Sequence, residues 1–416
     1  MKLLTNHIRK IVGVLLCFAV IISMVGCKNN HLKGHRPAPV VAQAPAAVDN
    51  VIFTAAPTKQ PVAHAQRHVH MLVLVHGTVL PLPSWSAFWQ STKQKDGSWY
   101  QNYLNQLRYH ELYATQPIGE FGLHAINQPA VGNVEFSINQ LAACFLTKAY
   151  QSDTKYVDTE IVCYTFGWDG RLDHKHRLAW GKRLYKELGD EIARLKKQHP
   201  NAHDTVMLDI FAHSHGGNVA LNMVHALTND KHLPWTVNRL VLLGTPVQRE
   251  TADLIQSPLF NRVYSIYSRG DAIQNLDFLS TKAGKSARRF DAMIDTTKQS
   301  KLVQIEVKVD HKKPTHVDLW FFKRWRLSLA VEPRDQVPVF VFVPLAFPSL
   351  EGDLRSMHDV AMNIESGVDA YAVQLRAKQL KTKKPAPLLQ RIICCAKDDF
   401  KRPGVLITAT SYDAPA

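Results

Sequence analysis

Runs of apolar residues alternate along the middle of the chain with segments of helical periodicity. In 177–197, apolar residues recur every three or four positions, which predicts a helix, and a second helix is predicted over 216–227. The intervening runs are short, and 71–75 is apolar throughout, as in strands buried on both faces. Strands that alternate with helices predict an α/β fold with a mostly parallel sheet flanked by helices. The predicted strands are 71–75, 161–166, 206–211, 240–243, 262–267 and 302–309.

Two stretches do not follow this alternation. Residues 80–158 are too long for one crossover, and they combine several Trp and Tyr residues with an amphipathic segment at 136–150. We predict a helical insertion beside the functional site, with most of its aromatic side chains packed in a hydrophobic core. Beyond a main domain at 67–330, the apolar run 339–343 predicts a strand and 368–380 predicts a helix, within a C-terminal extension at 331–416.

The N-terminus carries its own pattern. Three basic residues precede an apolar run at 11–25, which is too short to span a bilayer but typical of a signal peptide, here 1–26. Gly26-Cys27 at the end of this run resembles the lipobox of bacterial lipoproteins, which implies that Cys27 is lipidated and anchors the chain in the cell envelope. Lys28 favours the outer membrane. An ordinary secretory signal or a short uncleaved anchor also fits the charge and length of this segment.

Composition and charge narrow the class of protein. A hydrophobic content of 46% with 20% charged residues indicates a globular chain, and the Pro- and Ala-rich segment up to 66 is predicted to be a spacer. Removal of the signal peptide lowers the net charge from +15 by three, to +12. This surplus lies in separate clusters, at 312–313, 323–326 and 378–384, and a diffuse positive surface favours anionic lipid headgroups. No nucleic-acid partner is expected, because no recognisable nucleic-acid module accompanies the charge.

The motif most informative about chemistry is Phe211-Ala-His-Ser-His-Gly-Gly-Asn218, which follows a predicted strand and opens a predicted helix. A nucleophile on such a sharp turn needs small residues two positions before and after it, where Ala212 and Gly216 stand. Ser214 is therefore the predicted nucleophile. The helix after it would direct free N–H groups, that of His215 among them, towards a developing oxyanion.

A second motif stands at the end of the first strand, His76-Gly77-Thr78. Together with the Ser214 motif and the strand order, it resembles the α/β-hydrolases over roughly residues 67–330. The resemblance implies an α/β-hydrolase fold and an oxyanion hole formed by the backbone amides of Thr78 and His215. It also implies a lipase- or esterase-like serine hydrolase. A turn at Phe166-Gly-Trp168-Asp-Gly170 is similar to one in lipid-acting members, where it has a positioning role.

In this class the catalytic acid follows the nucleophile along the chain and the histidine comes last. Asp271 follows Gly270 after the fifth strand, which matches the acid position, with Asp277 in reserve. His316 follows the sixth strand and precedes a predicted helix start, and His311 and His358 remain alternatives. The predicted triad is Ser214, Asp271 and His316.

Two other classes of function are open. Three His-x-His pairs, at 68/70, 174/176 and 213/215, could favour a metal-dependent hydrolase, but Gly217 and Asn218 replace the Asp and His of the common metal signature. No metal site and no cofactor are predicted. A non-catalytic surface lipoprotein could use the same fold for binding alone. The sequence favours a carboxylic-ester hydrolase that acts on a lipid or other apolar acyl ester.

Overall fold

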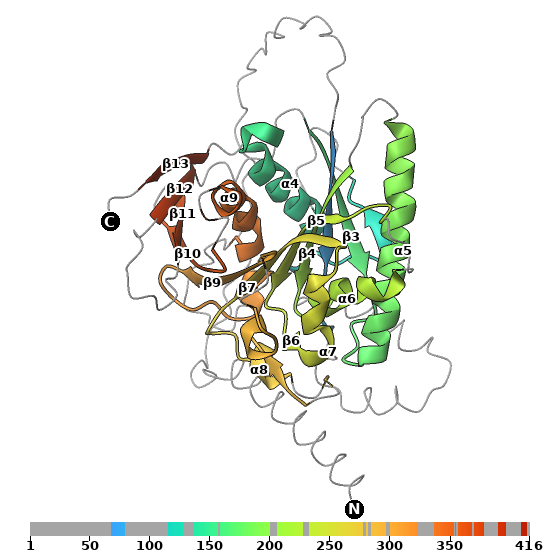
Figure 1. Cartoon of the computed structure of the whole chain (residues 1–416). Helices are drawn as coiled ribbons and strands as arrows, with labels where there is room; N and C mark the ends of the chain where they lie inside the picture. Colours follow the sequence, from blue (N-terminus) through green and yellow to red (C-terminus); the bar gives the residue numbers. More distant parts are fainter. Residues whose placement is uncertain are drawn as a thin grey trace, which may run out of the picture.

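The computed structural model describes most of the predicted main domain and parts of both flanking regions (Figure 1). The signal peptide, Cys27, the spacer and the aromatic residues of 80–114 lie outside the described residues. Within the described part of the chain, no helix is both long and apolar enough to cross a bilayer. The structure describes residues 68–79, 115–127, 137–156, 159–199, 206–227, 233–277, 280–281, 284–296, 300–322, 337–352, 354, 357–367, 370–377, 390–396 and 409–413.

One large sheet organises these residues, with eleven described strands in the order β13-β12-β11-β10-β9-β7-β5-β4-β1-β3-β2. The strands from β10 to β3 in that order pair in parallel, and β2 and β11 to β13 are antiparallel. The prediction of an α/β fold with a mostly parallel sheet is thus confirmed. The strands are β1 (Val69–Val75), β2 (Gly122–Ala125), β3 (Glu160–Gly167), β4 (Val206–His213), β5 (Val237–Leu243), β7 (Phe260–Tyr267), β9 (Leu302–Val309), β10 (Asp359–Ser366), β11 (Ala370–Ala377), β12 (Gln390–Ala396) and β13 (Ala409–Asp413).

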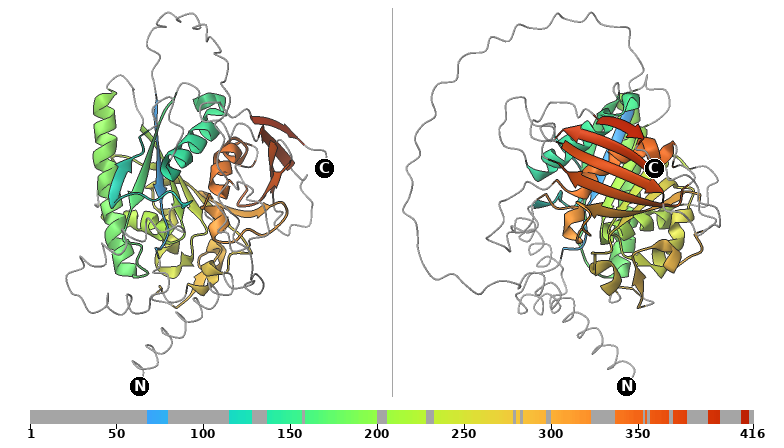
Figure 2. Two further views of the ribbon diagram at one scale, coloured as in Figure 1. Left: turned by 180° about the vertical axis from the view of Figure 1, so that it is seen from behind. Right: turned by 90° about the vertical axis from the view of Figure 1, so that its left-hand side faces the viewer.

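Helices cover both faces of the sheet, as Figures 1 and 2 show. One face packs against α5 (His174–Gln198) and α6 (His215–Leu221), which continues into the 3₁₀ turn η3 (Asn222–Ala226). The other face packs against α4 (Ile138–Gln151) and α9 (Val339–Glu351). The two faces of each central strand are therefore buried in separate apolar clusters, which explains the unbroken apolar run of β1.

Local sequence explains where the long helices begin. Asp173 precedes α5, and its side chain accepts hydrogen bonds from the backbone amides of Lys175 and His176. Ser137 and Gln140 form a capping box at the start of α4. Both devices satisfy amide groups that the first helical turn leaves without partners, and each stabilises its helix by about 1 kcal/mol.

Two predictions for the C-terminal segment are wrong. The run 339–343 is the first part of helix α9 and not a strand. This helix is buried on all sides from Val339 to Phe347, so its sequence shows no helical period to distinguish it from a buried strand. The segment 368–380, expected to be helical, contains strand β11, because antiparallel pairing with β10 and burial of Val373 and Leu375 favour the extended backbone.

Both flanking regions contribute to the same sheet. From the 80–158 region, β2 adds an antiparallel edge strand beside β3, and α4 packs in the apolar cluster that also holds α9. At the other edge, β10 pairs in parallel with β9, and β11 to β13 continue the sheet. The described residues of 331–416 therefore share the sheet and the core of the main domain.

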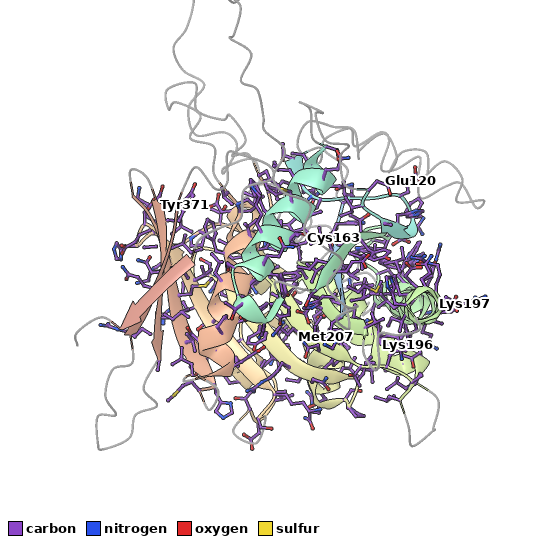
Figure 3. The ribbon with its side chains drawn as sticks, turned by 90° about the horizontal axis from the view of Figure 1, so that it is seen from above. Glu120, Cys163, Lys196, Lys197, Met207 and Tyr371 are labelled. Carbon is purple, nitrogen blue, oxygen red and sulfur yellow. The ribbon has the colours of Figure 1, made fainter. Side chains whose placement is uncertain are left out.

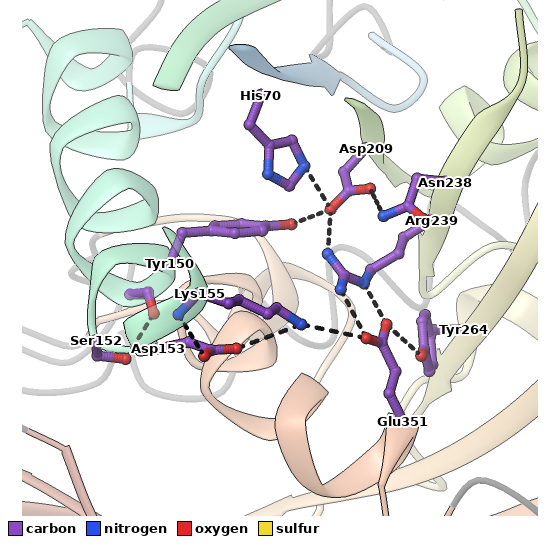
Figure 4. A network of polar contacts seen from close by, with 11 residues as sticks. His70, Tyr150, Ser152, Asp153, Lys155, Asp209, Asn238, Arg239, Tyr264 and Glu351 are labelled. Carbon is purple, nitrogen blue, oxygen red and sulfur yellow. Dashed lines mark hydrogen bonds and ion pairs between the residues drawn. The ribbon is translucent and has the colours of Figure 1, made fainter. Parts of the chain in front are cut away.

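A buried ion cluster ties α9 to the centre of the sheet (Figure 4). Asp209 of β4 is fully buried, and its Oδ2 accepts hydrogen bonds from Arg239 Nη1 at 2.8 Å and from the Tyr150 hydroxyl at 2.5 Å. His70 Nε2 lies 3.0 Å from the same oxygen. The Arg239 guanidinium also binds both carboxylate oxygens of Glu351 at the end of α9. Burial alone would raise the pKa of Asp209, but the Arg239 charge together with His70 and the Tyr150 hydroxyl outweighs burial and holds that pKa well below its usual range.

Candidate active site

Ser214 occupies a sharp turn between β4 and α6. Its backbone has φ 51° and ψ −130°, a conformation that costs a non-glycine residue about 1–3 kcal/mol. The turn is held by the Ser214 amide, which donates to the Leu243 carbonyl at 2.9 Å. A Cβ on Gly216 would lie 2.3 Å from the His76 carbonyl oxygen, so the next loop leaves no room for a larger residue there. This is the crowding that a serine on a strand-to-helix turn produces.

The loop after β1 lies directly beside Ser214, because β1 and β4 are neighbours that pair Val75 with Ala212. A Cβ on Gly77 would lie 2.7 Å from Ser214 Cβ. Thr78 follows on this loop, and its hydroxyl oxygen is buried without a hydrogen-bond partner among the described residues. The segments that carry the Thr78 and His215 amides therefore meet at Ser214.

Trp168 follows β3, the neighbour of β1 in the sheet, and it fixes this loop. Its backbone amide donates to His76 Nε2 at 3.1 Å, its indole N–H donates to the His76 carbonyl at 2.7 Å, and the two rings stack. Gly170 has φ +67°, and a Cβ there would lie 2.6 Å from the Val79 amide nitrogen. The turn at 166–170 thus holds the 76–79 loop in place.

Asp271 and His316 form a hydrogen-bonded pair at the same edge of the sheet. His316 Nδ1 lies 2.6 Å from Asp271 Oδ2, and Asp271 is fully buried. The other carboxylate oxygen of Asp271 accepts the amides of Ile273 at 2.9 Å and Gln274 at 3.3 Å. Because the carboxylate accepts the Nδ1 proton, the lone pair of the neutral ring lies on Nε2, as a general base requires.

The alternatives named from the sequence have other partners. Asp277 Oδ1 lies 3.1 Å from His215 Nε2. His311 Nε2 lies 2.8 Å from Glu365 on an exposed turn, and His358 Nδ1 lies 3.4 Å from the Leu302 carbonyl. Of these histidines, His316 is the one that Asp271 binds.

The backbone at 243–244 connects Ser214 with this pair. Leu243 accepts the Ser214 amide, and a Cβ on Gly244, which has φ +59°, would lie 3.2 Å from His316 Nδ1. Among the described residues, no hydrogen bond joins the Ser214 hydroxyl to the His316 ring. Such bonds are commonly long in ligand-free enzymes and tighten when substrate binds. Ser214 and His316 are 5% and 8% exposed, so both are buried.

The His213 ring packs against the His316 ring. The two ring centroids are 4.6 Å apart, and His213 Nε2–H donates to the His316 carbonyl at 3.2 Å. On its other side, His213 stacks on Trp320 with ring planes 5° apart. Burial, reinforced by the neighbouring His316, lowers the pKa of His213 well below its usual value. His213 therefore stays neutral and acts as a spacer between Trp320 and His316.

A second polar network surrounds His215, and the sequence analysis missed most of it. Asp277 Oδ2 accepts Gln248 Nε2 at 2.7 Å, and Gln248 also donates to the Ser280 hydroxyl at 2.8 Å. Arg177 Nη2 donates to Gln248 at 3.1 Å and to the Ser280 carbonyl at 2.8 Å. Burial lowers the pKa of His215, although Asp277 opposes that shift.

One signal of this network was present in the sequence. Arg177 lies on the same helical stripe as Leu184 and Leu188, and it is fully buried. A charged residue on an apolar stripe indicates a buried polar partner. The network holds the side chain that follows the candidate nucleophile, and with it the start of α6.

The His-x-His pair at 213/215 does not converge on one point. His213 turns towards His316 and Trp320, whereas His215 turns towards Asp277 and Ser280. In the parts of the chain that the structure covers, no three His, Cys, Asp or Glu side chains are grouped so that they could hold a metal ion.

No protein-family model, curated protein or solved structure matches this chain. The geometry of the site therefore has to carry the functional assignment.

Proposed function

We propose that this protein is a serine hydrolase of the α/β-hydrolase class that cleaves carboxylic esters through an acyl-enzyme. The observation that carries the proposal is the combination of a strained serine between β4 and α6 with a buried Asp–His pair on the adjacent loops. A non-glycine residue at positive φ persists where the surroundings enforce it, and such strain is concentrated at functional sites.

The proposed reaction begins with attack of Ser214 Oγ on the ester carbonyl carbon, while His316 Nε2 takes the hydroxyl proton. Asp271 holds the ring in the required tautomer and stabilises its protonated form. The Thr78 and His215 amides stabilise the negative oxygen of the tetrahedral intermediate. His316 then gives its proton to the departing alcohol, which leaves an acyl group on Ser214. Water, deprotonated by His316, hydrolyses this acyl-enzyme and releases the carboxylic acid.

The proposed substrate is a lipid or other apolar acyl ester. The support is the signal-like N-terminus with Cys27, which would keep the enzyme at a membrane surface where such esters are concentrated. Because Ser214 is only 5% exposed, the neighbouring loops must open locally to admit the ester.

The test is covalent labelling of the full-length protein with a fluorophosphonate, which reacts with activated serines. We expect labelling of the native protein and of a Ser257→Ala control, and none of Ser214→Ala. His316→Gln should abolish labelling, whereas His358→Gln should retain it. Hydrolysis of p-nitrophenyl esters should fall by about 10⁶-fold in Ser214→Ala, since a triad acts as a unit. An unlabelled native protein with no esterase activity would instead favour a non-catalytic binding protein with this fold.

A further inference from the structure

A groove of about 520 Å³ is lined in part by the loops that carry Asp271 and His316. Its floor is the outer part of the sheet, at β9, β10 and β11, and its rim is formed by the loops at 269 and 311–313. Four cations line it: Arg269, Lys308, Lys313 and Arg376. Of these four, only Lys313 belongs to a basic cluster visible in the sequence, at 312–313, because the others are distant in sequence.

Strand alternation explains why the cations converge. Val307 of β9, Met362 of β10 and Leu375 of β11 are buried in the apolar cluster with α4 and α9. Their chain neighbours point to the opposite face. On β9 and β11 these neighbours are Lys308 and Arg376, and both are exposed. The groove face of β9 and β11 is thus polar, and β10 contributes Ala361 and Asn363 beside it.

A tight turn fixes the rim. Asp310 and His311 both have positive φ, 48° and 60°, which is uncommon for residues other than glycine. The turn is held to β10, since the His311 amide donates to Asn363 Oδ1 at 3.1 Å and Asp310 Oδ1 accepts the Ser366 amide at 2.7 Å. Lys313 therefore stands on a backbone anchored to the groove floor.

Among the described residues that line the groove, cations outnumber carboxylates. Arg269 pairs with Glu306 at 2.9 Å, and Glu306 is the one acidic residue among those that line the groove. No ion pair with any other described residue neutralises Lys308, Lys313 or Arg376. A concave surface with this excess of cations focuses positive potential, and it favours a compact group that carries more than one negative charge.

The rim belongs to the same loops as the Asp–His pair. Arg269 precedes Asp271 by two residues, and Lys313 precedes His316 by three. The loops touch, since a Cβ on Gly270 would lie 2.6 Å from the Lys313 carbonyl oxygen. A group bound in the groove would therefore sit against the segments that position the candidate base.

We propose that the groove binds a phosphate-type dianion, and that this dianion is the phosphate headgroup of the ester that Ser214 cleaves. The second half of this inference rests on the proposed function. The substrate class is then a phosphate-bearing acyl ester, such as an acyl ester of glycerol phosphate. Lys308, Lys313 and Arg376 bind the phosphate oxygens, and the acyl ester extends towards Ser214.

Binding is tested first, with inorganic phosphate and the full-length Ser214→Ala protein, by isothermal titration calorimetry. The Lys308→Gln/Arg376→Gln double substitution should weaken binding by on the order of tenfold for each cation removed. The matched control is Lys196→Gln/Lys197→Gln, which removes two exposed cations at the end of α5, on the far side of the molecule from β11 (Figure 3). The control should bind phosphate as the parent does. Equal binding by the groove variant and the control would overturn the site.

Kinetics then separate the two sources of phosphate. The substrates are 1-octanoyl-glycerol 3-phosphate and 1-octanoyl-glycerol, which share the ester and differ only in the phosphate. The native protein should prefer the phosphate-bearing ester in kcat/KM, and the groove variant should lose this preference by roughly the factor that it loses in phosphate binding. Phosphate binding without such a preference would show that free phosphate, and not a headgroup, occupies the groove, and would overturn the substrate class.

The two proposals fail in different ways. If fluorophosphonate does not label Ser214, the proposed function fails, while the calorimetric comparison still decides whether the groove binds phosphate. If labelling succeeds but both esters are cleaved equally by the native protein and the groove variant, the hydrolase stands and the substrate class is wrong. Melting temperatures of all variants provide the check on folding.

Discussion

Replacement of Asp271 by Asn tests the Asp–His pair most directly. In the structure, Asp271 Oδ1 accepts the amides of Ile273 and Gln274, whereas Oδ2 accepts His316 Nδ1 at 2.6 Å. An Asn side chain has one oxygen, and the two backbone amides retain it. The NH₂ group must therefore face His316, where a donor now meets Nδ1. The ring responds by moving its proton to Nε2, and the lone pair that Ser214 needs is lost.

The expected loss follows from this change of tautomer. A base held in the wrong tautomer, in an otherwise intact site, costs about 10⁴-fold in kcat, which corresponds to about 5.5 kcal/mol of transition-state stabilisation. Folding should change little, because Asn has nearly the shape of Asp and keeps both backbone amide bonds. We expect the melting temperature to fall by a few degrees at most, since the change weakens one charge-assisted hydrogen bond.

The assay is kcat and KM for p-nitrophenyl esters, with Asp291→Asn as the matched control. Asp291 is exposed and forms an ion pair with Arg289, so its substitution should leave kcat at the native value. The reasoning is refuted if Asp271→Asn keeps more than about a tenth of native kcat, because the tautomer argument requires a far larger loss. A large rise in KM with native kcat would equally contradict it, because the Asp271–His316 pair would then act in substrate binding.

Three further predictions follow from other parts of the molecule. Arg239→Met leaves Asp209 buried without its cation, and urea denaturation should show a loss of about 3–5 kcal/mol in unfolding free energy. Gly244→Ala places a Cβ at positive φ, 3.0 Å from Asp271 Oδ2, so it should cost about 1–2 kcal/mol and lower kcat in the ester assay. Burial lowers the pKa of His213 below its unfolded value of 6.5, so the unfolded state binds the extra proton and the unfolding free energy should fall as the pH drops below about 6.5. The fall should be smaller in His213→Gln, and an identical pH dependence of urea denaturation would contradict this origin.

Much of the fold was predictable because its central strands are short, apolar and separated by turn residues. The predicted strands at 71–75, 161–166 and 302–309 lie within the observed β1, β3 and β9. The prediction failed where the usual period is absent or brief. Helix α9 is apolar on every side, so its sequence shows no helical period. In β11, Val373 and Leu375 do alternate with Gln374 and Arg376, but the strand is only eight residues long and more than half of them are alanine or long polar residues that also favour helices.

The residues of the candidate site also differ in how far the sequence could predict them. Ser214 could be selected from its local motif, because the turn dictates small neighbours along the chain. Asp271 and His316 could be selected only from their order after the strands, and it is the sheet that brings them within 2.6 Å. The network of Arg177, Gln248 and Ser280 depends on side chains that meet from three separate segments, and no local pattern specifies that meeting.

The packing of α9 has a consequence for how this chain can be divided. The helix lies against the sheet face formed by the main strands, and Glu351 at its end shares the Arg239 guanidinium with Asp209. A protein shortened after residue 330 would expose that apolar face to water. It would also lack Glu351, one of the two carboxylates that the Arg239 guanidinium binds. Such a fragment should aggregate when expressed, so residues 331–416, about a fifth of the chain, have to be retained whenever the protein is produced or engineered.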